Sequence, residues 1–138
     1  MKTHVFRLRP GQDLRMEIDK FVRERNIRAG VILTCVGNLN KAILRMANAK
    51  ITKTWAGSFE IVSLVGTVES GNSHLHICLS DEEGKTFGGH LKGGSLIGVT
   101  AEVAIGEIEN LEFARRFDET TGYNELVVRS KDKSGFSQ

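Results

Sequence analysis

Beyond one early helical stretch, this chain consists of short apolar runs spaced as β-strands. The helical stretch follows Asp13, which can cap it, and extends to about Arg25 with apolar side chains at helical spacing. The dipeptide Gly37-Asn38 is a turn signal between two of the later runs. The runs either alternate between apolar and polar residues or are apolar throughout, as buried strands are. They cover residues 3–8, 29–36, 41–46, 59–68, 75–79, 86–91, 96–108, 111–117 and 125–128.

This pattern predicts an α+β fold in a single domain. We expect a mostly antiparallel β-sheet of about seven strands, with one main helix covering it. A length of 138 residues is that of one domain and is enough to bury a core. The domain is expected at residues 1–130, and residues 131–138 are expected to form a flexible polar tail. Since such a sheet must cover its second face or protect its edges, we also expect oligomerisation.

Three of the four histidines lie within one predicted β-hairpin. His74 and His76 are two residues apart, so on a strand their side chains point to the same face. The loop at 82–84 ends in glycine, which suits a type I turn closed by a left-handed residue. In that register His76 lies directly across from His90, and His74 lies one step away on the same face.

Three converging imidazoles are a common way to hold zinc while a fourth coordination position stays open. The candidate metal ligands are therefore His74, His76 and His90. The competing interpretation is that they are ordinary hydrogen-bonding residues of half-buried strands, and a register shifted by one residue would move His90 to the other face. Cys78 shares the face of His74 and His76, and is either a fourth ligand or a small buried apolar residue.

Composition and charge set broad limits on the function. The chain is 40% hydrophobic and 26% charged, which is typical of a soluble globular protein. A formal net charge of +2 is too small to indicate nucleic-acid binding by itself. Cys35 and Cys78 lie in apolar strand-like runs, so we expect a reducing, cytoplasmic compartment. The N-terminus lacks the apolar core of a signal peptide, and no run reaches membrane-spanning length.

Glycine is abundant, with 15 glycines against one proline, and several of them flank His90. The glycine-rich segment at 88–98 lacks the closing Gly-Lys-Ser/Thr of a phosphate-binding loop. These glycines therefore either let the backbone approach a ligand closely or form tight turns and bulges.

Several stretches, taken in order, resemble a known family. They are Ala-Gly-Val-Ile at 29–32, Gly-Ser-Phe-Glu-Ile at 57–61, the histidine stretch ending in Gly-Gly-His-Leu at 88–91, and the segment 113–126. Together they resemble the PPC domain, the plant- and prokaryote-conserved domain, over most of the chain. The histidine hairpin is similar to that of the stand-alone bacterial and archaeal members.

The resemblance implies an α+β fold, assembly as a homotrimer, and zinc carried by His74, His76 and His90. Prokaryotic relatives are described as DNA-binding, which implies a DNA-binding or regulatory module. Plant members add AT-hook segments, but no Arg-Gly-Arg-Pro occurs in this chain. The plant partner-binding segment has an arginine where this chain has Ser58, so that partner contact does not carry over.

Two functions from different classes remain open. The first is a trimeric DNA-binding or regulatory module that carries the three-histidine metal site. The alternative is a metal-dependent small-molecule-binding protein, hydrolase or lyase, with Glu60 or Glu69 as the nearest general base in sequence. A metal that only stabilises the trimer is a third hypothesis. The cations available for DNA form a modest basic stretch of Lys41, Arg45, Lys50 and Lys53, which Lys92 and the lysines of the tail can extend; the competing interpretation is that they are scattered over a solvated face.

Overall fold

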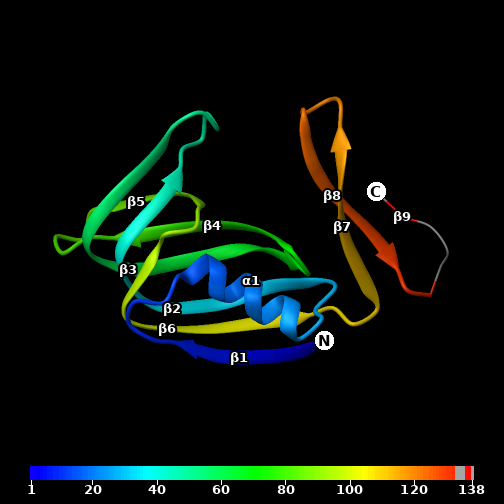
Figure 1. Ribbon diagram of the computed structural model, residues 1–138, viewed down its shortest axis with the longest axis horizontal. Helices are drawn as coiled ribbons and strands as arrows, with labels where there is room; N and C mark the ends of the chain where they lie inside the picture. The colour runs from blue at the N-terminus through cyan, green and yellow to red at the C-terminus, as the bar shows by residue number, and fades with distance from the viewer. Residues whose placement is uncertain (133–135, 138) are drawn as a thin grey trace.

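The computed structural model describes residues 1–132 and 136–137, and this part of the chain contains one helix and nine strands. Figure 1 shows the helix lying across one face of a large sheet, with a hairpin standing at the end of that sheet. The elements are β1 (Lys2–Leu8), α1 (Leu14–Glu24), β2 (Gly30–Arg45), β3 (Thr52–Glu69), β4 (Asn72–Ser80), β5 (Thr86–Leu91), β6 (Leu96–Glu107), β7 (Leu111–Asp118), β8 (Tyr123–Ser130) and β9 (Phe136–Ser137).

The strands form two sheets. One has the order β1-β6-β2-β3-β4-β5, and the other has the order β7-β8-β9. Every pairing is antiparallel, which confirms the predicted α+β class with one covering helix. The strand count exceeds the expected seven partly because β9 adds a short pairing to β8. Of the predicted flexible tail at 131–138, residues 133–135 and 138 lie outside the described residues, and Phe136–Ser137 form β9.

The predicted turn at Gly37-Asn38 is wrong, because β2 is a single strand that passes through it. The register between β2 and β6 shifts just after Gly37, whose φ is 148°. A Cβ at this position would collide with the carbonyl oxygen of Thr100. Oδ1 of Asn38 accepts a hydrogen bond from the backbone N–H of Val99 at 2.9 Å. The turn signal therefore marks a β-bulge that bends a long strand.

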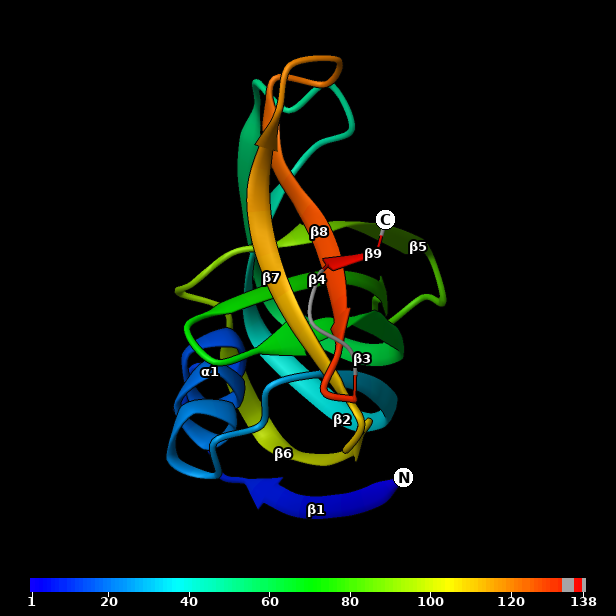
Figure 2. The same ribbon diagram turned by 90° about the vertical axis from the view of Figure 1, so that its right-hand side faces the viewer.

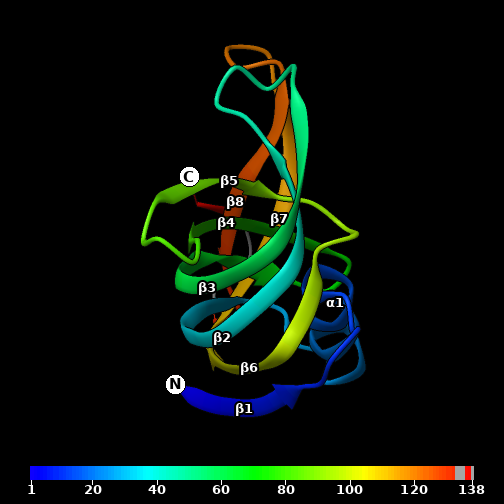
Figure 3. The same ribbon diagram turned by 90° about the vertical axis from the view of Figure 1, so that its left-hand side faces the viewer.

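The length and bend of β2 let it pair with different neighbours along its course. Its last residues pair with β5, with Leu44 opposite Leu91 and Arg45 opposite His90. This contact curls β2, β3, β4 and β5 around a shared core, as the end-on views in Figures 2 and 3 show. The fully buried side chains there include Leu39, Leu44, Leu79 and Leu91. The curl brings the end of β2 beside the strand that carries His90.

Helix α1 begins where the sequence predicts. Oδ1 of Asp13 accepts the N–H of Met16 at 3.0 Å, and its Oδ2 accepts the N–H of Gly94 at 2.6 Å. The apolar face of the helix is buried against the sheet through Leu14, Ile18 and Val22. The cap thus fixes the start of α1 to the loop that follows β5. Within the described residues, no helix combines the length and apolar character needed to cross a bilayer.

Replacement of Asp13 by alanine removes both hydrogen bonds. We expect Asp13→Ala to lower the free energy of unfolding by about 1–2 kcal/mol, because the Met16 and Gly94 N–H groups lose their acceptor. Urea unfolding followed by circular dichroism measures this change. Lys20→Ala, an exposed position on the same helix, is the control and should leave stability nearly unchanged. Equal stability of the two variants would contradict the role of the cap.

Candidate metal centre

The β4–β5 hairpin has the register that the sequence predicts. The N–H of Asp81 donates to the carbonyl of Lys85 at 2.9 Å, and Oδ1 of Asp81 accepts the N–H of Lys85 at 2.9 Å. Gly84 takes the left-handed conformation with φ of 83°. These contacts close the turn in one way only, and they leave His76 directly opposite His90.

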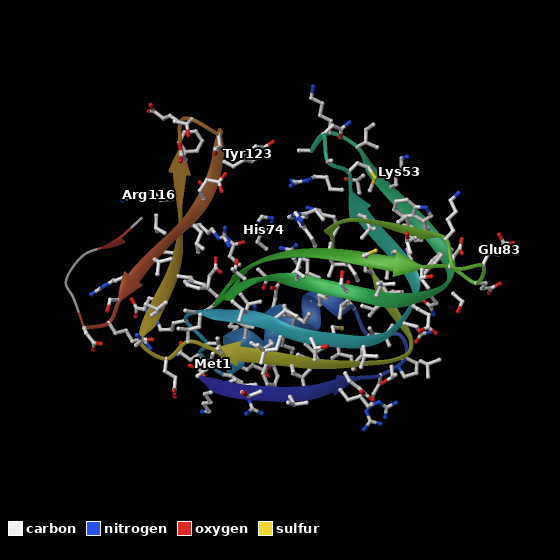
Figure 4. The ribbon with its side chains drawn as sticks, turned by 180° about the vertical axis from the view of Figure 1, so that it is seen from behind. Met1, Lys53, His74, Glu83, Arg116 and Tyr123 are labelled. Carbon is white, nitrogen blue, oxygen red and sulfur yellow. The ribbon has the colours of Figure 1, made fainter. Side chains whose placement is uncertain are left out.

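The three histidines converge on one face of the hairpin. One ring nitrogen from each of His74, His76 and His90 lies within 4.8 Å of the others. The Nε2 atoms of His74 and His76 are 3.1 Å apart, and the three ring centroids are separated by 4.9, 5.3 and 5.4 Å. Figure 4 shows His74 above the sheet, between the hairpin that carries Tyr123 and the one that carries Lys53.

The surroundings of His74 and His90 favour their neutral imidazoles, and the neutral form is the one that binds metal ions. Burial lowers the pKa of His90 to about 4, and the positive charges of Arg45 and Arg15 contribute to the shift. Burial also lowers the pKa of His74, with His76 as the next cause. Nδ1 of His90 is buried and lacks a hydrogen-bond partner among the described residues. An unsatisfied buried nitrogen beside two other imidazoles fits a divalent metal ion.

Cys78 stands apart from this cluster. It lies opposite Gly88, one same-face step beyond His76, and its side chain is half-buried. The group of potential ligand atoms found in the described residues contains the three histidines without Cys78. This position agrees better with a small packing residue than with a fourth ligand.

The glycines before His90 have a structural role. A Cβ at Gly88 would collide with the carbonyl oxygen of Ile77, and one at Gly89 would lie 2.8 Å from the carbonyl oxygen of Arg45. They allow β5 to lie close to both of its neighbouring strands.

A pocket of about 470 Å³ opens beside His74 and His90. The turn after β2, at residues 47–49, forms one wall, and the start of β8, at residues 123–125, forms the other. Three arginines also line it, namely Arg15, Arg45 and Arg115. Arg15, Arg115 and Glu125 were not among the residues singled out from the sequence, since they come from elements that only tertiary packing brings to the hairpin.

Neither general base suggested by sequence proximity lies in the pocket. Glu60 is opposite Ser80, toward the far end of β4 from His74. Glu69 is buried and holds Nε of Arg115 through its Oε1 at 2.8 Å. The carboxylate that does line the pocket is Glu125, whose Oε1 accepts the hydroxyl of Thr121 at 2.9 Å.

The family model of the Plants and Prokaryotes Conserved (PCC) domain matches residues 1–109. The chain belongs to this family. The predicted resemblance to the PPC domain is thereby confirmed, and the match covers α1 and the strands of the large sheet but ends before β7.

Known proteins similar to this PPC-domain chain differ in length and description. The bifunctional protein GlmU of Synechococcus sp. (strain JA-3-3Ab) is 38% identical over 128 residues, which is 93% of this chain and 21% of GlmU. The chain thus spans about a fifth of that curated relative. A hypothetical protein from Salmonella superposes with a TM-score of 0.92 at 37% identity, over 94% of each chain. A metal-containing protein from Archaeoglobus fulgidus superposes with a TM-score of 0.74 at 29% sequence identity, over 91% of this chain and 92% of its own chain.

The Glu69–Arg115 ion pair joins β7 to β3 at the edge of the pocket, and Arg115 also donates to Oγ1 of Thr67 at 2.9 Å. We expect Arg115→Met to destabilise the fold by about 3 kcal/mol, because it leaves a buried carboxyl without its partner. Burial raises the pKa of Glu69, against the opposing effect of Arg115. Removal of the arginine therefore raises this pKa further.

A folded-state pKa above the unfolded value favours the folded protein at low pH, and this advantage is lost as pH rises through the folded pKa. The loss of stability in Arg115→Met should therefore be larger at pH 8 than at pH 5, in urea unfolding at both values. Arg116→Met, an exposed neighbour on the same strand, is the control. A loss that is equal at both pH values, or no greater than that of the control, would argue against the ion pair.

Proposed function

We propose that this PPC-domain protein binds a zinc ion through His74, His76 and His90 and uses it to bind or transform a small molecule. The proposal is carried by the convergence of three ring nitrogens within 4.8 Å, with His74 and His90 lining a pocket of about 470 Å³. Three histidine ligands suit zinc and leave one coordination position for a ligand. The similarity to the metal-containing protein from Archaeoglobus fulgidus supports the choice of a metal.

The residues around the cluster suit a hydrolase or lyase. A zinc ion held by three histidines supplies a Lewis acid that polarises a carbonyl or phosphoryl group. His74 and His76 from β4 and His90 from β5 would hold this ion through their ring nitrogens. The pocket provides space beside the histidines, and the carboxylate of Glu125 on the opposite wall is the group placed to hold or accept a proton.

Zinc binding is tested by elemental analysis of purified protein. We expect about one zinc per chain in the wild type and a loss of most of it in His76→Ala, because two imidazoles hold the ion far less tightly than three. His4→Gln is the matched control. His4 is the one histidine outside the cluster, and its Nε2 is 2.8 Å from Oε2 of Glu107. Equal zinc content in all three proteins, or zinc in none of them after reconstitution, would refute the site.

We further propose that the protein is a homotrimer, as the resemblance implies. The face of the sheet turned away from α1 exposes Val5, Val36 and Val65, with exposed fractions of 71%, 54% and 57%. Their neighbours in the strands point inward, since Phe6 stacks on Phe21 of the helix and Cys35 and Leu64 are buried. Exposed apolar residues gathered on one sheet face favour contact with another copy.

Charge on this face should break the assembly without affecting the single chain. We expect wild-type protein to have three times the 15.2 kDa chain mass by light scattering, and Val5→Lys/Val36→Lys to approach one chain mass. Met16→Lys, at an exposed apolar position on α1, is the control and should remain trimeric. A wild-type protein that is monomeric at all concentrations would contradict the proposal.

A DNA-binding or regulatory role is the second candidate. It is favoured by Lys50 and Lys53, which are exposed on the β2–β3 hairpin that projects from the sheet. We expect Lys50→Glu/Lys53→Glu to abolish any retardation of duplex DNA at low salt, because phosphate contacts depend on clustered cations. Lys20→Glu, a single charge reversal at an exposed position on α1, is the control and should leave any retardation largely unchanged. Wild-type protein that fails to retard DNA at low salt would exclude this role.

A further inference from the structure

Arg45 is placed beside the histidine cluster by strand pairing. It lies directly opposite His90 in the β2–β5 ladder, and His90 lies directly opposite His76 in the β4–β5 ladder. Residues opposite each other in antiparallel strands project to the same face. Arg45 therefore continues the row of side chains that the histidines begin, and it lines the same pocket.

The other two arginines of the pocket are already engaged by the protein. Arg15 donates to the carbonyl oxygens of Leu91 at 2.7 Å and Ser73 at 2.8 Å. Arg115 is held by Glu69 and Thr67. Within residues 1–132 and 136–137, the guanidinium of Arg45 makes neither a hydrogen bond nor an ion pair. It is a half-buried cation whose donors remain available to a ligand.

The rest of the lining fits the body of an organic ligand. Asn72 and Asn124 offer neutral amides, and the one carboxylate, Glu125, lies on the β8 wall while Arg45 belongs to the β2 wall. A negative group is therefore favoured at the Arg45 side. The volume of about 470 Å³ exceeds the need of an inorganic ion and is in the range of small-molecule sites.

We infer that this pocket takes a small organic ligand through an oxyanion, either a carboxylate or a phosphate group, that binds Arg45 beside the metal. The inference rests on the proposed zinc site, which provides the second contact to the same ligand. Arginine suits this role because its planar guanidinium matches the geometry of both groups and stays charged. The ligand class is thus anionic, and specificity resides partly in Arg45.

Isothermal titration of the full chain tests the inference, with inorganic phosphate and malonate as probes. Each probe is titrated into zinc-loaded and chelated protein, and the zinc content of every sample is measured. Arg45→Gln removes the cation, and Lys53→Gln removes one positive charge from the same hairpin but outside the pocket lining. Arg45→Lys retains the charge and serves as a second variant if the glutamine variant folds poorly by circular dichroism.

We expect zinc-loaded wild type and Lys53→Gln to bind at least one probe with equal affinity, and Arg45→Gln to bind it about tenfold more weakly. Arg45→Lys should bind with an intermediate affinity. The probe that binds more tightly distinguishes a phosphate from a carboxylate ligand.

Equal affinity of wild type and both Arg45 variants, or the absence of saturable binding, would overturn the inference while the zinc content still supports the metal site. Arg45-dependent binding in protein that takes up no zinc would refute the metal site and support the oxyanion pocket.

Discussion

The register of the β4–β5 hairpin is the constraint on which the site depends. The side chain and backbone of Asp81 hydrogen-bond to Lys85 across the turn, and Gly84 takes the left-handed conformation that closes it. A slip of one residue would move His90 to the face occupied by Leu75 and Leu79, and it would bury an imidazole in the core. The core-facing leucines and the turn therefore select the same register, and the histidines meet as a consequence.

The pocket around the histidines depends on contacts made much further apart in the sequence. The bulge at Gly37 bends β2 so that its end reaches β5, and this pairing places Arg45 next to His90. Arg15 joins α1 to the carbonyl oxygens of β4 and β5 residues, and Arg115 joins β7 to a buried glutamate. Arg15 and Arg115 are thus engaged by the protein itself, and Arg45 is the arginine of the pocket without such a contact within the described residues.

The sequence alone predicts the histidine cluster because a hairpin is a local structure. The register of the hairpin follows from the alternation of residues along its strands and from one turn. The sequence therefore predicts that His76 lies opposite His90. The turn predicted at Gly37-Asn38 is wrong because a β-bulge and a turn both favour glycine and asparagine, so the local sequence does not distinguish them. Glu60 and Glu69 are close to the histidines in sequence but do not line the pocket, because Glu60 lies toward the far end of β4 from His74 and Glu69 is buried in its ion pair with Arg115.

Arg115 and Glu125 show what local patterns do not reveal. They lie on the β7–β8 hairpin, which begins after the region matched by the family model. The approach of this hairpin to β3 and β4 rests on a long-range ion pair and on packing, neither of which leaves a periodic signal in the sequence. The charge of the pocket, on which the inferred anionic class of ligand rests, therefore could not be predicted from the sequence.

X-ray absorption at the zinc edge tests the central claim most directly, because it measures the atoms bound to the metal in the intact protein. We expect nitrogen or oxygen neighbours at about 2.0–2.1 Å, with the outer scattering pattern of three imidazole rings. A sulfur neighbour at about 2.3 Å would bring Cys78 into the site and close the open position. A shell without imidazole scattering would show that the three histidines do not bind the metal.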